Sequence, residues 1–218
     1  MYFSSRLQAG RMLASQLLLK YRYENCAVVA LNDGGVMVGA QIAMQLHCVL
    51  TMLVSQEIML PREPNAIGGI TAQGDFSYNS AYAPSEIDEI VGEYRNYIEQ
   101  EKFTRLHEMN QLLGGGGLIS RDLLKGHNII LVADGLKDGF LLDMASEFLK
   151  PIAFEKLIIA VPLASVSAVD RMHLLADEIY CQSVVENYID TNHYYDKQDV
   201  PTHQTIVRTL KNIILHWK

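Results

Sequence analysis

Cysteine is scarce in this sequence, and its copies are widely spaced. Cys26, Cys48 and Cys181 form no C-x-x-C pair, and each lies in an apolar stretch. Small secreted scaffolds and cysteine-based zinc modules need paired, closely spaced cysteines. The spacing therefore supports neither a disulfide framework nor a zinc knuckle, and we expect three buried thiols.

Long apolar runs and an excess of positive charge are also missing. No stretch is long enough to span a bilayer, and residues 1–19 are interrupted by Arg6, Gln8 and Arg11, unlike a secretory signal. Lys and Arg number 18 against 25 Asp and Glu, a net charge of −7, so a basic face for nucleic acid is not expected. We therefore predict a soluble cytoplasmic protein with neither a membrane nor a nucleic-acid partner.

Several catalytic signatures are absent as well. The chain has no G-x-G-x-x-G, no G-K-S/T, no H-E-x-x-H and no G-x-S-x-G. A dinucleotide fingerprint, a Walker loop, a zinc-protease helix and a nucleophile elbow are therefore unsupported. The seven histidines show no paired ligand spacing, so no metal-binding residue is assigned.

What the chain does contain is a strand, a glycine loop and a helix in its second half. An apolar run at 127–132 is followed by Ala133, Asp134 and a loop with two glycines, and residues 141–149 read as a helix. Loop amides and a helix dipole favour a phosphate, while Asp134 can accept hydrogen bonds from sugar hydroxyls. The alternative interpretation is a plain turn with an aspartate cap.

The same order recurs elsewhere and predicts an α/β fold with a parallel sheet flanked by helices. Further strands are expected at 26–31, 48–54, 156–161 and 178–182, with helices at 5–23, 36–46 and 165–176. An apolar stripe that includes Ile206, Leu210 and Trp217 predicts a C-terminal helix, and residues 184–202 should be irregular. The apolar first and last helices are compatible with a homodimer.

Residues 59–85 interrupt this alternation. They hold Pro61, Pro64, Gly68, Gly69 and Gly74 in a connection too long for an ordinary turn, which predicts a mobile lid, a hairpin excursion or disorder. A helix should follow, with Ser85 and Asp88 as a variant capping box, and residues 114–117, four glycines, should form a hinge. We predict a single domain over residues 1–218, with the lid at about 59–85.

Taken together, short motifs along nearly the whole chain resemble the type I phosphoribosyltransferase-like proteins of bacteria. The resemblance rests on Phe3-x-x-Arg6-x-x-Ala9-Gly10, Val28 to Val36, Ala66 to Ile70, Glu93-x-Arg95, Ile129 to Gly139, Ala160 to Ala164, Ala176 to Glu178 and Tyr194-Tyr195-Asp196. It implies a parallel sheet with a lid and a small hood. It also implies attack by a nitrogenous base on C1 of phosphoribosyl diphosphate, with Mg²⁺ on the pyrophosphate, as in nucleotide metabolism.

The resemblance assigns roles to two glycine loops. Asp134 becomes the catalytic acid at the ribose, and the partner becomes a small phosphorylated sugar or nucleotide. The first glycine loop (residues 32–35) takes pyrophosphate, and the second (residues 134–140) takes ribose and the 5′-phosphate. The implied binding residues are Asn32, Asp33, Gly34 and Gly35 in the first loop and Asp134, Gly135, Leu136, Lys137, Asp138, Gly139 and Phe140 in the second.

The sequence departs from the family pattern at four places. Ala133 replaces the first acid, Asp138 replaces a threonine, Asp33 stands in the first loop, and Ser55-Gln56-Glu57 replaces a basic pair. Two like charges about 4 Å apart repel by roughly 4 kcal/mol at an effective dielectric of 20. Lys137, or Mg²⁺ held by Asp33 or Asp138, would offset this. Two hypotheses follow: a phosphoribosyltransferase, or a catalytically degenerate protein that binds a nucleotide or sugar phosphate for regulation.

Overall fold

A computed structural model of the chain describes residues 2–61, 63, 65–113 and 119–216, with side chains up to residue 210. The predicted glycine hinge at 114–117 and Trp217 lie outside the described residues. Among the described helices, none is long and apolar enough to cross a membrane.

The centre of the molecule is a five-stranded parallel sheet, as predicted. Its strands are β1 (Cys26–Ala30), β2 (Val49–Met52), β6 (Asn128–Val132), β7 (Lys156–Ser165) and β8 (Glu178–Val185). They lie in the order β2-β1-β6-β7-β8, and every neighbouring pair is parallel. Ala30 pairs with Met52 on one side and Val132 on the other, so β1, β2 and β6 end at the same edge.

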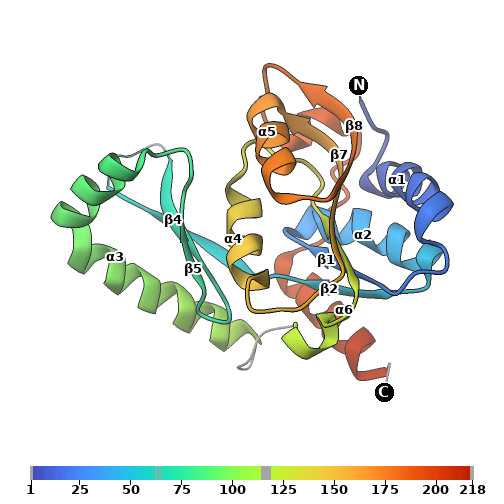
Figure 1. Cartoon of the computed structure of the whole chain (residues 1–218), viewed down its shortest axis with the longest axis horizontal. Coiled ribbons are helices and arrows are strands. Elements are labelled where there is room, and N and C mark those ends of the chain that lie inside the picture. The colour runs from blue at the N-terminus through green and yellow to red at the C-terminus, as the bar shows by residue number, and fades with distance from the viewer. Residues whose placement is uncertain (1, 62, 64, 114–118, 217–218) are drawn as a thin grey trace.

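Helices cover both faces of this sheet (Figure 1). Alternate residues of β1 show this: Val28 belongs to the core formed with α1, α2 and α6, and Val29 to the core formed with α4 and α5. Strands buried on both faces read as continuous apolar runs, which is why β1 and β6 were recognisable in the sequence. The helices are α1 (Arg6–Tyr21), α2 (Asp33–Leu46), α4 (Phe140–Leu149), α5 (Val166–Leu175) and α6 (His203–His216). We call this sheet with these helices the body.

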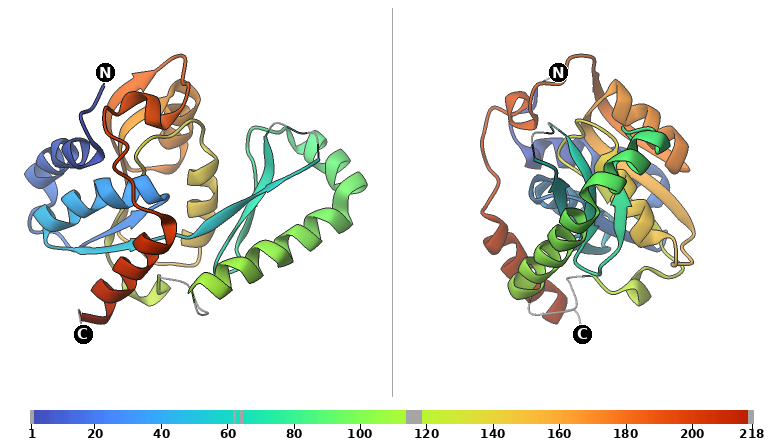
Figure 2. Two further views of the ribbon diagram at one scale, coloured as in Figure 1. Left: turned by 180° about the vertical axis from the view of Figure 1, so that it is seen from behind. Right: turned by 90° about the vertical axis from the view of Figure 1, so that its left-hand side faces the viewer.

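A second unit, which we call the arm, stands beside the body next to α4 (Figures 1 and 2). It consists of β3 (Ser55–Met59), β4 (Ala66–Thr71), β5 (Phe76–Tyr78) and the long helix α3 (Pro84–Leu113). The strands form an antiparallel sheet in the order β3-β4-β5, and Ile58, Ile67 and Ile98 pack between sheet and helix. The described part of residues 59–85 therefore contains a hairpin, β4-β5, and the mobility of this segment as a lid stays a prediction. The predicted strand at 48–54 ends at Met52, and β3 begins at Ser55.

The start of α3 differs from the predicted capping box. The helix begins at Pro84, a residue that suits the first helical position because it lacks an amide proton. The Glu86 carboxylate accepts a hydrogen bond from the Ala83 amide at 2.7 Å, so Ser85 and Asp88 are not the cap. At its other end, α3 inserts Met109 and Leu113 into the body's core, which anchors the arm.

The start of the chain pairs with the segment that follows β8. Phe3 pairs with Tyr195 in a parallel bridge, and the Phe3 amide donates to the Tyr194 carbonyl at 2.9 Å. Tyr194 is the last residue of a short 3-10 helix, η2 (Thr191–Tyr194), which lies in the region predicted to be irregular. A second 3-10 helix, η1 (Arg121–Leu124), precedes β6. Because the bridge fixes the start of α1, it also fixes where Arg6 lies.

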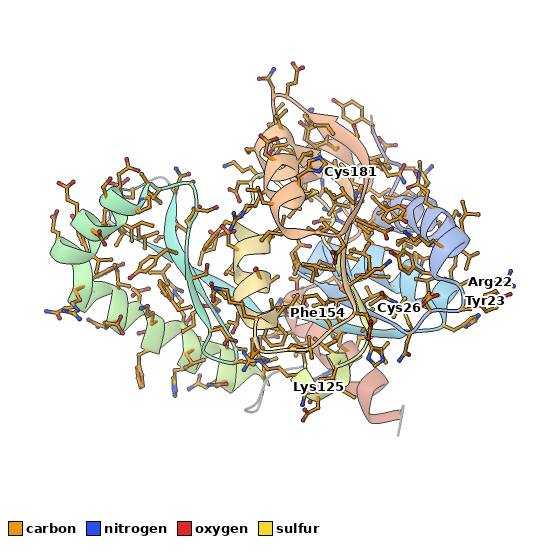
Figure 3. The ribbon with its side chains drawn as sticks, in the orientation of Figure 1. Arg22, Tyr23, Cys26, Lys125, Phe154 and Cys181 are labelled. Carbon is orange, nitrogen blue, oxygen red and sulfur yellow. The ribbon has the colours of Figure 1, made fainter. Side chains whose placement is uncertain are left out.

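All three cysteines are free thiols in the body, where Figure 3 labels Cys26 and Cys181. Cys26 is buried as expected, but Cys48 and Cys181 are half-buried. Burial raises the pKa of Cys26 to about 11 and that of Cys48 to about 12. A thiol with so high a pKa carries little thiolate near neutral pH, so neither is a nucleophile.

Candidate functional site

The two glycine loops meet at the carboxyl edge of the parallel sheet. Asn32 follows β1 and Asp134 follows the adjacent strand β6, and the Asn32 amide donates a hydrogen bond to Asp134 Oδ1 at 2.8 Å. Ligands of open α/β sheets bind at this edge. The juxtaposition expected from the sequence is therefore present.

Asp134 lies beneath the loops rather than facing outward. It is 4% exposed, and the Arg6 guanidinium donates from Nε to Asp134 Oδ2 at 2.6 Å. The Tyr195 hydroxyl donates to the Asp134 main-chain oxygen at 2.6 Å. Burial raises the pKa of the Asp134 carboxyl, and Arg6 and Asn32 oppose that rise. Both carboxylate oxygens expected to accept from ribose hydroxyls are thus engaged by the protein itself.

Arg6 is the partner that the sequence analysis did not identify. It is 1% exposed, and besides Asp134 it donates to Asn192 Oδ1 at 2.6 Å and to Asp199 Oδ1 at 3.4 Å. Its guanidinium also stacks over the Tyr195 ring, 4.4 Å from the centroid. A buried charge needs such partners, because an unpaired one is very costly. Arg6 and Tyr195 both belong to motifs quoted above, but nothing local indicated that they pair.

The glycines of the first loop allow close packing against the second. Asn32 caps α2 by accepting from the Gly35 amide at 2.7 Å. A Cβ atom at Gly34 would lie 1.9 Å from Asp134 Oδ2, and one at Gly35 would lie 2.7 Å from the Val132 carbonyl oxygen. These glycines are therefore required by the contact with Asp134 and β6, whatever else they bind.

Asp33, the acid in the first loop, has a partner from the far end of the chain. His203, at the start of α6, lies 2.6 Å from it, measured from Nδ1 to Asp33 Oδ1. Both side chains are partly exposed. His203 thus contacts Asp33, the carboxylate that was expected from the sequence to repel pyrophosphate.

The second glycine loop has a buried half that continues the sheet. Leu136 bridges to β7: its amide donates to the Leu163 carbonyl at 3.1 Å, and its carbonyl accepts from the Ser165 amide at 2.9 Å. A Cβ atom at Gly135 would lie 2.3 Å from the Tyr188 hydroxyl. Gly135 and Leu136 are therefore structural in this arrangement.

The other half of this loop faces outward. Lys137 and Asp138 are exposed, and Asp138 Oδ1 accepts a hydrogen bond from the Phe140 amide at 3.0 Å, at the start of α4. A Cβ atom at Gly139 would lie 2.4 Å from Arg171 Cγ, which places that arginine of α5 against the loop. Arg171 itself is paired with Asp143, at 2.5 Å. The polar groups that can meet a ligand here are those of residues 137–139.

Two adjoining cavities lie over these loops. The first, about 290 Å³, is enclosed by the second glycine loop, Asn32, η2 and the base of the arm. The second, about 220 Å³, lies between the first glycine loop, the end of β2, α4 and His203. They share Asn32, Glu57 and Leu141 and together form one hollow. Its polar and charged lining consists of Asn32, Asp33, Ser55, Glu57, Asn65, Asn79, Lys137, Asp138, Thr191 and His203.

The lining of the hollow includes the acidic residues at which the sequence departs from the family pattern. Ser55 and Glu57, which stand where the family pattern has a basic pair, line the hollow. Desolvation raises the pKa of the Glu57 carboxyl, Asp138 adds to the rise, and Lys137 opposes it. Carboxylates from the arm and the second loop are thus close enough to interact, so an anionic ligand would need Lys137 and His203 to offset them.

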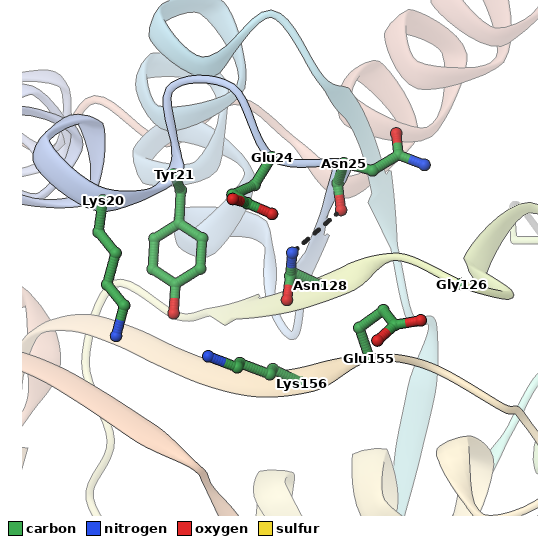
Figure 4. A pocket seen from close by; sticks show the side chains of 8 residues that line it. All are labelled: Lys20, Tyr21, Glu24, Asn25, Gly126, Asn128, Glu155 and Lys156. Carbon is green, nitrogen blue, oxygen red and sulfur yellow. Dashed lines mark hydrogen bonds between the residues drawn. The ribbon is translucent and has the colours of Figure 1, made fainter.

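Another cavity, of about 370 Å³, opens at the opposite edge of the sheet (Figure 4). Lys20, Tyr21, Asn128 and Lys156 line it, near the amino ends of β6 and β7. Lys20 is ion-paired with Glu178, and Lys156 Nζ lies 3.7 Å from the same carboxylate. Because ligands of this sheet type bind at the carboxyl edge and these lysines already have a counter-ion, we place the candidate site at the glycine loops.

Comparison with known proteins identifies the family. The family model described as the phosphoribosyl transferase domain matches residues 3–199. The chain therefore belongs to the phosphoribosyl transferase domain family. This is the family that the sequence motifs resemble.

Curated relatives carry similar names, and solved structures share the fold. Two Mycobacterium tuberculosis proteins, “Putative phosphoribosyl transferase MT0597” and “Putative phosphoribosyl transferase Rv0571c”, are each 27% identical over 181 residues. The match covers 82% of this chain, which spans only 40% of the length of these curated relatives. The protein TT1426 from Thermus thermophilus has a TM-score of 0.70 at 22% identity, covering 100% of this chain and 99% of that one. A hypoxanthine phosphoribosyltransferase from Staphylococcus aureus has a TM-score of 0.50 at 11% identity, covering 85% and 77%.

Proposed function

We propose that the hollow at the carboxyl edge binds phosphoribosyl diphosphate and transfers ribose 5-phosphate to a nitrogenous base or related acceptor. The observation that carries the proposal is the meeting of two glycine loops, each at the start of a helix, over one hollow. The acceptor's lone pair would form the bond to C1 while the bond from C1 to the pyrophosphate oxygen breaks. Pyrophosphate would leave with the electron pair.

The exposed half of the second loop is the proposed 5′-phosphate site. Residues 137–139 precede α4, whose N-terminus favours an anion, and Lys137 adds a positive charge. The pyrophosphate would lie at the start of α2, over the first loop. Asp134 then serves as a positioning residue, because its engaged carboxylate holds Asn32 and Arg6 in place.

The residues present fit a magnesium ion that arrives with its substrate. Among the described residues, no group of three or more His, Cys, Asp or Glu could hold a metal by itself. Mg²⁺ is commonly bound by one or two carboxylates together with substrate phosphates. Asp138 would be the protein ligand, since Asp33 is engaged by His203. When bound, the ion would neutralise charge on the departing pyrophosphate.

A second candidate, binding without turnover, is favoured by the closed Arg6–Asp134 pair, which leaves no free carboxylate oxygen for the ribose. Calorimetry with phosphoribosyl diphosphate and Mg²⁺, followed by phosphorus NMR for pyrophosphate release with a panel of bases, separates the two. Binding with release supports the transferase, and binding without release supports the regulatory alternative. The cytoplasmic location, a role in nucleotide metabolism and a homodimer stay predictions.

A matched pair of lysine variants tests the site itself. Lys137→Ala removes the loop's cation and should weaken binding of ribose 5-phosphate roughly tenfold, the worth of one hydrogen bond to a charged group. Lys125→Ala is the control, because Lys125 is exposed and ion-paired with Asp122 away from the loops. Equal affinities of the two variants would contradict the proposed phosphate site.

A further inference from the structure

We propose that His203, on the C-terminal helix, is the cationic residue that receives the pyrophosphate, and that it replaces the basic pair missing at residues 55–57. This inference deepens the proposed function and rests on it. It assigns a binding role to α6, which lies 170 residues from the loop that it contacts.

The inner cavity, of about 220 Å³, has more acidic than basic side chains in its described lining. Its described lining includes two carboxylates, Asp33 and Glu57, and one side chain that can carry a positive charge, His203. Lys137 belongs to the outer cavity, on the side of the 5′-phosphate. A pyrophosphate over the first glycine loop would therefore meet His203 as its nearest cationic partner among the lining residues.

Asp33 orients the imidazole of His203. An ionised carboxylate can only accept hydrogen bonds, so the 2.6 Å contact to Asp33 requires the hydrogen on His203 Nδ1. The hydrogen bond of one ring nitrogen determines the role of the other. Asp33 thus fixes the ring and assigns Nε2 to a ligand. With a hydrogen on each ring nitrogen, His203 carries a positive charge opposite Asp33 and can donate from Nε2 to a pyrophosphate oxygen.

Both helices that carry this contact are packed into the core of the body. His203 is the first residue of α6, whose residues Ile206, Val207 and Leu210 are buried in the body's core. The start of α2, which carries Asp33, packs into the same core through Val36 and Val38. Because both ends of the contact are anchored by apolar packing, His203 already lies at the first glycine loop before a ligand binds.

Calorimetry on the full chain with two half-ligands tests the inference. Inorganic pyrophosphate with Mg²⁺ probes the first loop, and ribose 5-phosphate probes the second. We expect His203→Gln to weaken pyrophosphate binding roughly tenfold and to leave ribose 5-phosphate binding unchanged. His203→Lys, which restores a positive charge, should bind pyrophosphate within about threefold of the unaltered protein.

The Asp33→Asn variant and a matched histidine control complete the design. In an Asp33→Asn background, His203→Gln should cost less than in the unaltered protein, because the charge to be neutralised is gone. His193→Gln, in the same C-terminal region, is the control, since His193 contacts the Tyr2 hydroxyl and should not affect either ligand. Thermal unfolding checks that each variant is folded.

The outcomes separate this inference from the proposed function. It is overturned if His203→Gln leaves pyrophosphate affinity unchanged, if both half-ligands weaken equally, or if His203→Lys fails to restore binding. Binding of ribose 5-phosphate but not pyrophosphate by the unaltered protein would overturn this inference alone. Failure to bind either half-ligand would overturn the proposed function and this inference with it.

Discussion

The two glycine loops share one plan, a buried strand, a glycine turn and a helix, but they are held in different ways. The first has a local element of its own, since Asn32 caps α2 through the Gly35 amide, and it also contacts Asp134 and His203. The second is held by distant parts of the chain: Leu136 pairs with β7, and Arg171 of α5 packs on Gly139. The first loop therefore combines a local cap with distant contacts, whereas the contacts given for the second come from β7 and α5.

The acids of the loops differ in the same way. Asp134, two residues after the end of β6, is buried and paired with Arg6, while Asp138, four residues later, is exposed. Asp33 lies between these extremes, partly exposed and paired with His203. Distance from the end of the strand thus separates an acid that holds the fold together from one that can meet a ligand.

The largest effect should come from breaking the buried pair. Arg6→Met leaves the Asp134 carboxylate buried without its counter-ion, so we expect a loss of about 3–5 kcal/mol in the free energy of unfolding. Adding Asp134→Asn should recover a large part of that loss. Arg11→Met, at an exposed arginine of the same helix, is the control and should change stability by less than about 0.5 kcal/mol. Urea unfolding measures all four proteins; a loss below about 1 kcal/mol for Arg6→Met would show that the pair is not a structural requirement.

The close contact between the loops predicts the next largest effect. In Gly34→Ala the new methyl group would overlap Asp134 Oδ2, so the loops must separate, at a cost of about 1–3 kcal/mol. Gly92→Ala is the matched control. Gly92 lies in α3 with nothing near its Cβ position, so alanine there should stabilise by roughly 0.5–1 kcal/mol. Thermal unfolding that showed Gly34→Ala to be neutral would contradict the interlocked arrangement.

The exposed acid should affect a ligand more than the fold. Asp138→Thr removes a negative charge beside the proposed 5′-phosphate, and a threonine hydroxyl can still accept from the Phe140 amide. Without Mg²⁺, we expect affinity for phosphoribosyl diphosphate to rise about fivefold, roughly 1 kcal/mol, since solvent screens an exposed charge. With Mg²⁺ present the gain should disappear, because the variant lacks the carboxylate proposed to hold the ion. Calorimetry without and with Mg²⁺ decides it: unchanged or weaker binding without Mg²⁺ would mean that Asp138 points away from the phosphate.

The smallest effect concerns the arm's contribution to the hollow. Desolvation, with a further contribution from Asp138, raises the pKa of the Glu57 carboxyl, and this carboxylate lines the hollow; Glu57→Gln should therefore strengthen binding of an anion about twofold. Glu89→Gln on the exposed face of α3 is the control and should leave affinity unchanged. If both variants behave alike, the arm does not contribute charge to the site.

The sequence alone determined the parallel sheet and the two loops that follow β1 and β6. Continuous apolar runs identify strands buried on both faces, and the glycines after Ala30 and Val132 mark where the chain must turn closely. Parallel strands end at one edge of their sheet, so local patterns also placed both loops at that edge. These features are readable because each depends on residues close together in the chain.

Tertiary structure alone decided which charges meet. Arg6 pairs with Asp134 across 128 residues, His203 with Asp33 across 170, and β3 leaves the body to build the arm. No periodicity or turn signal specifies such partners, because a charged side chain has the same local pattern whether it faces water or a buried counter-ion. The physical reason is that the role of a charged side chain depends on its burial. The completed fold removes the Asp134 carboxylate from solvent, and a buried carboxylate is stable only with a counter-ion such as Arg6.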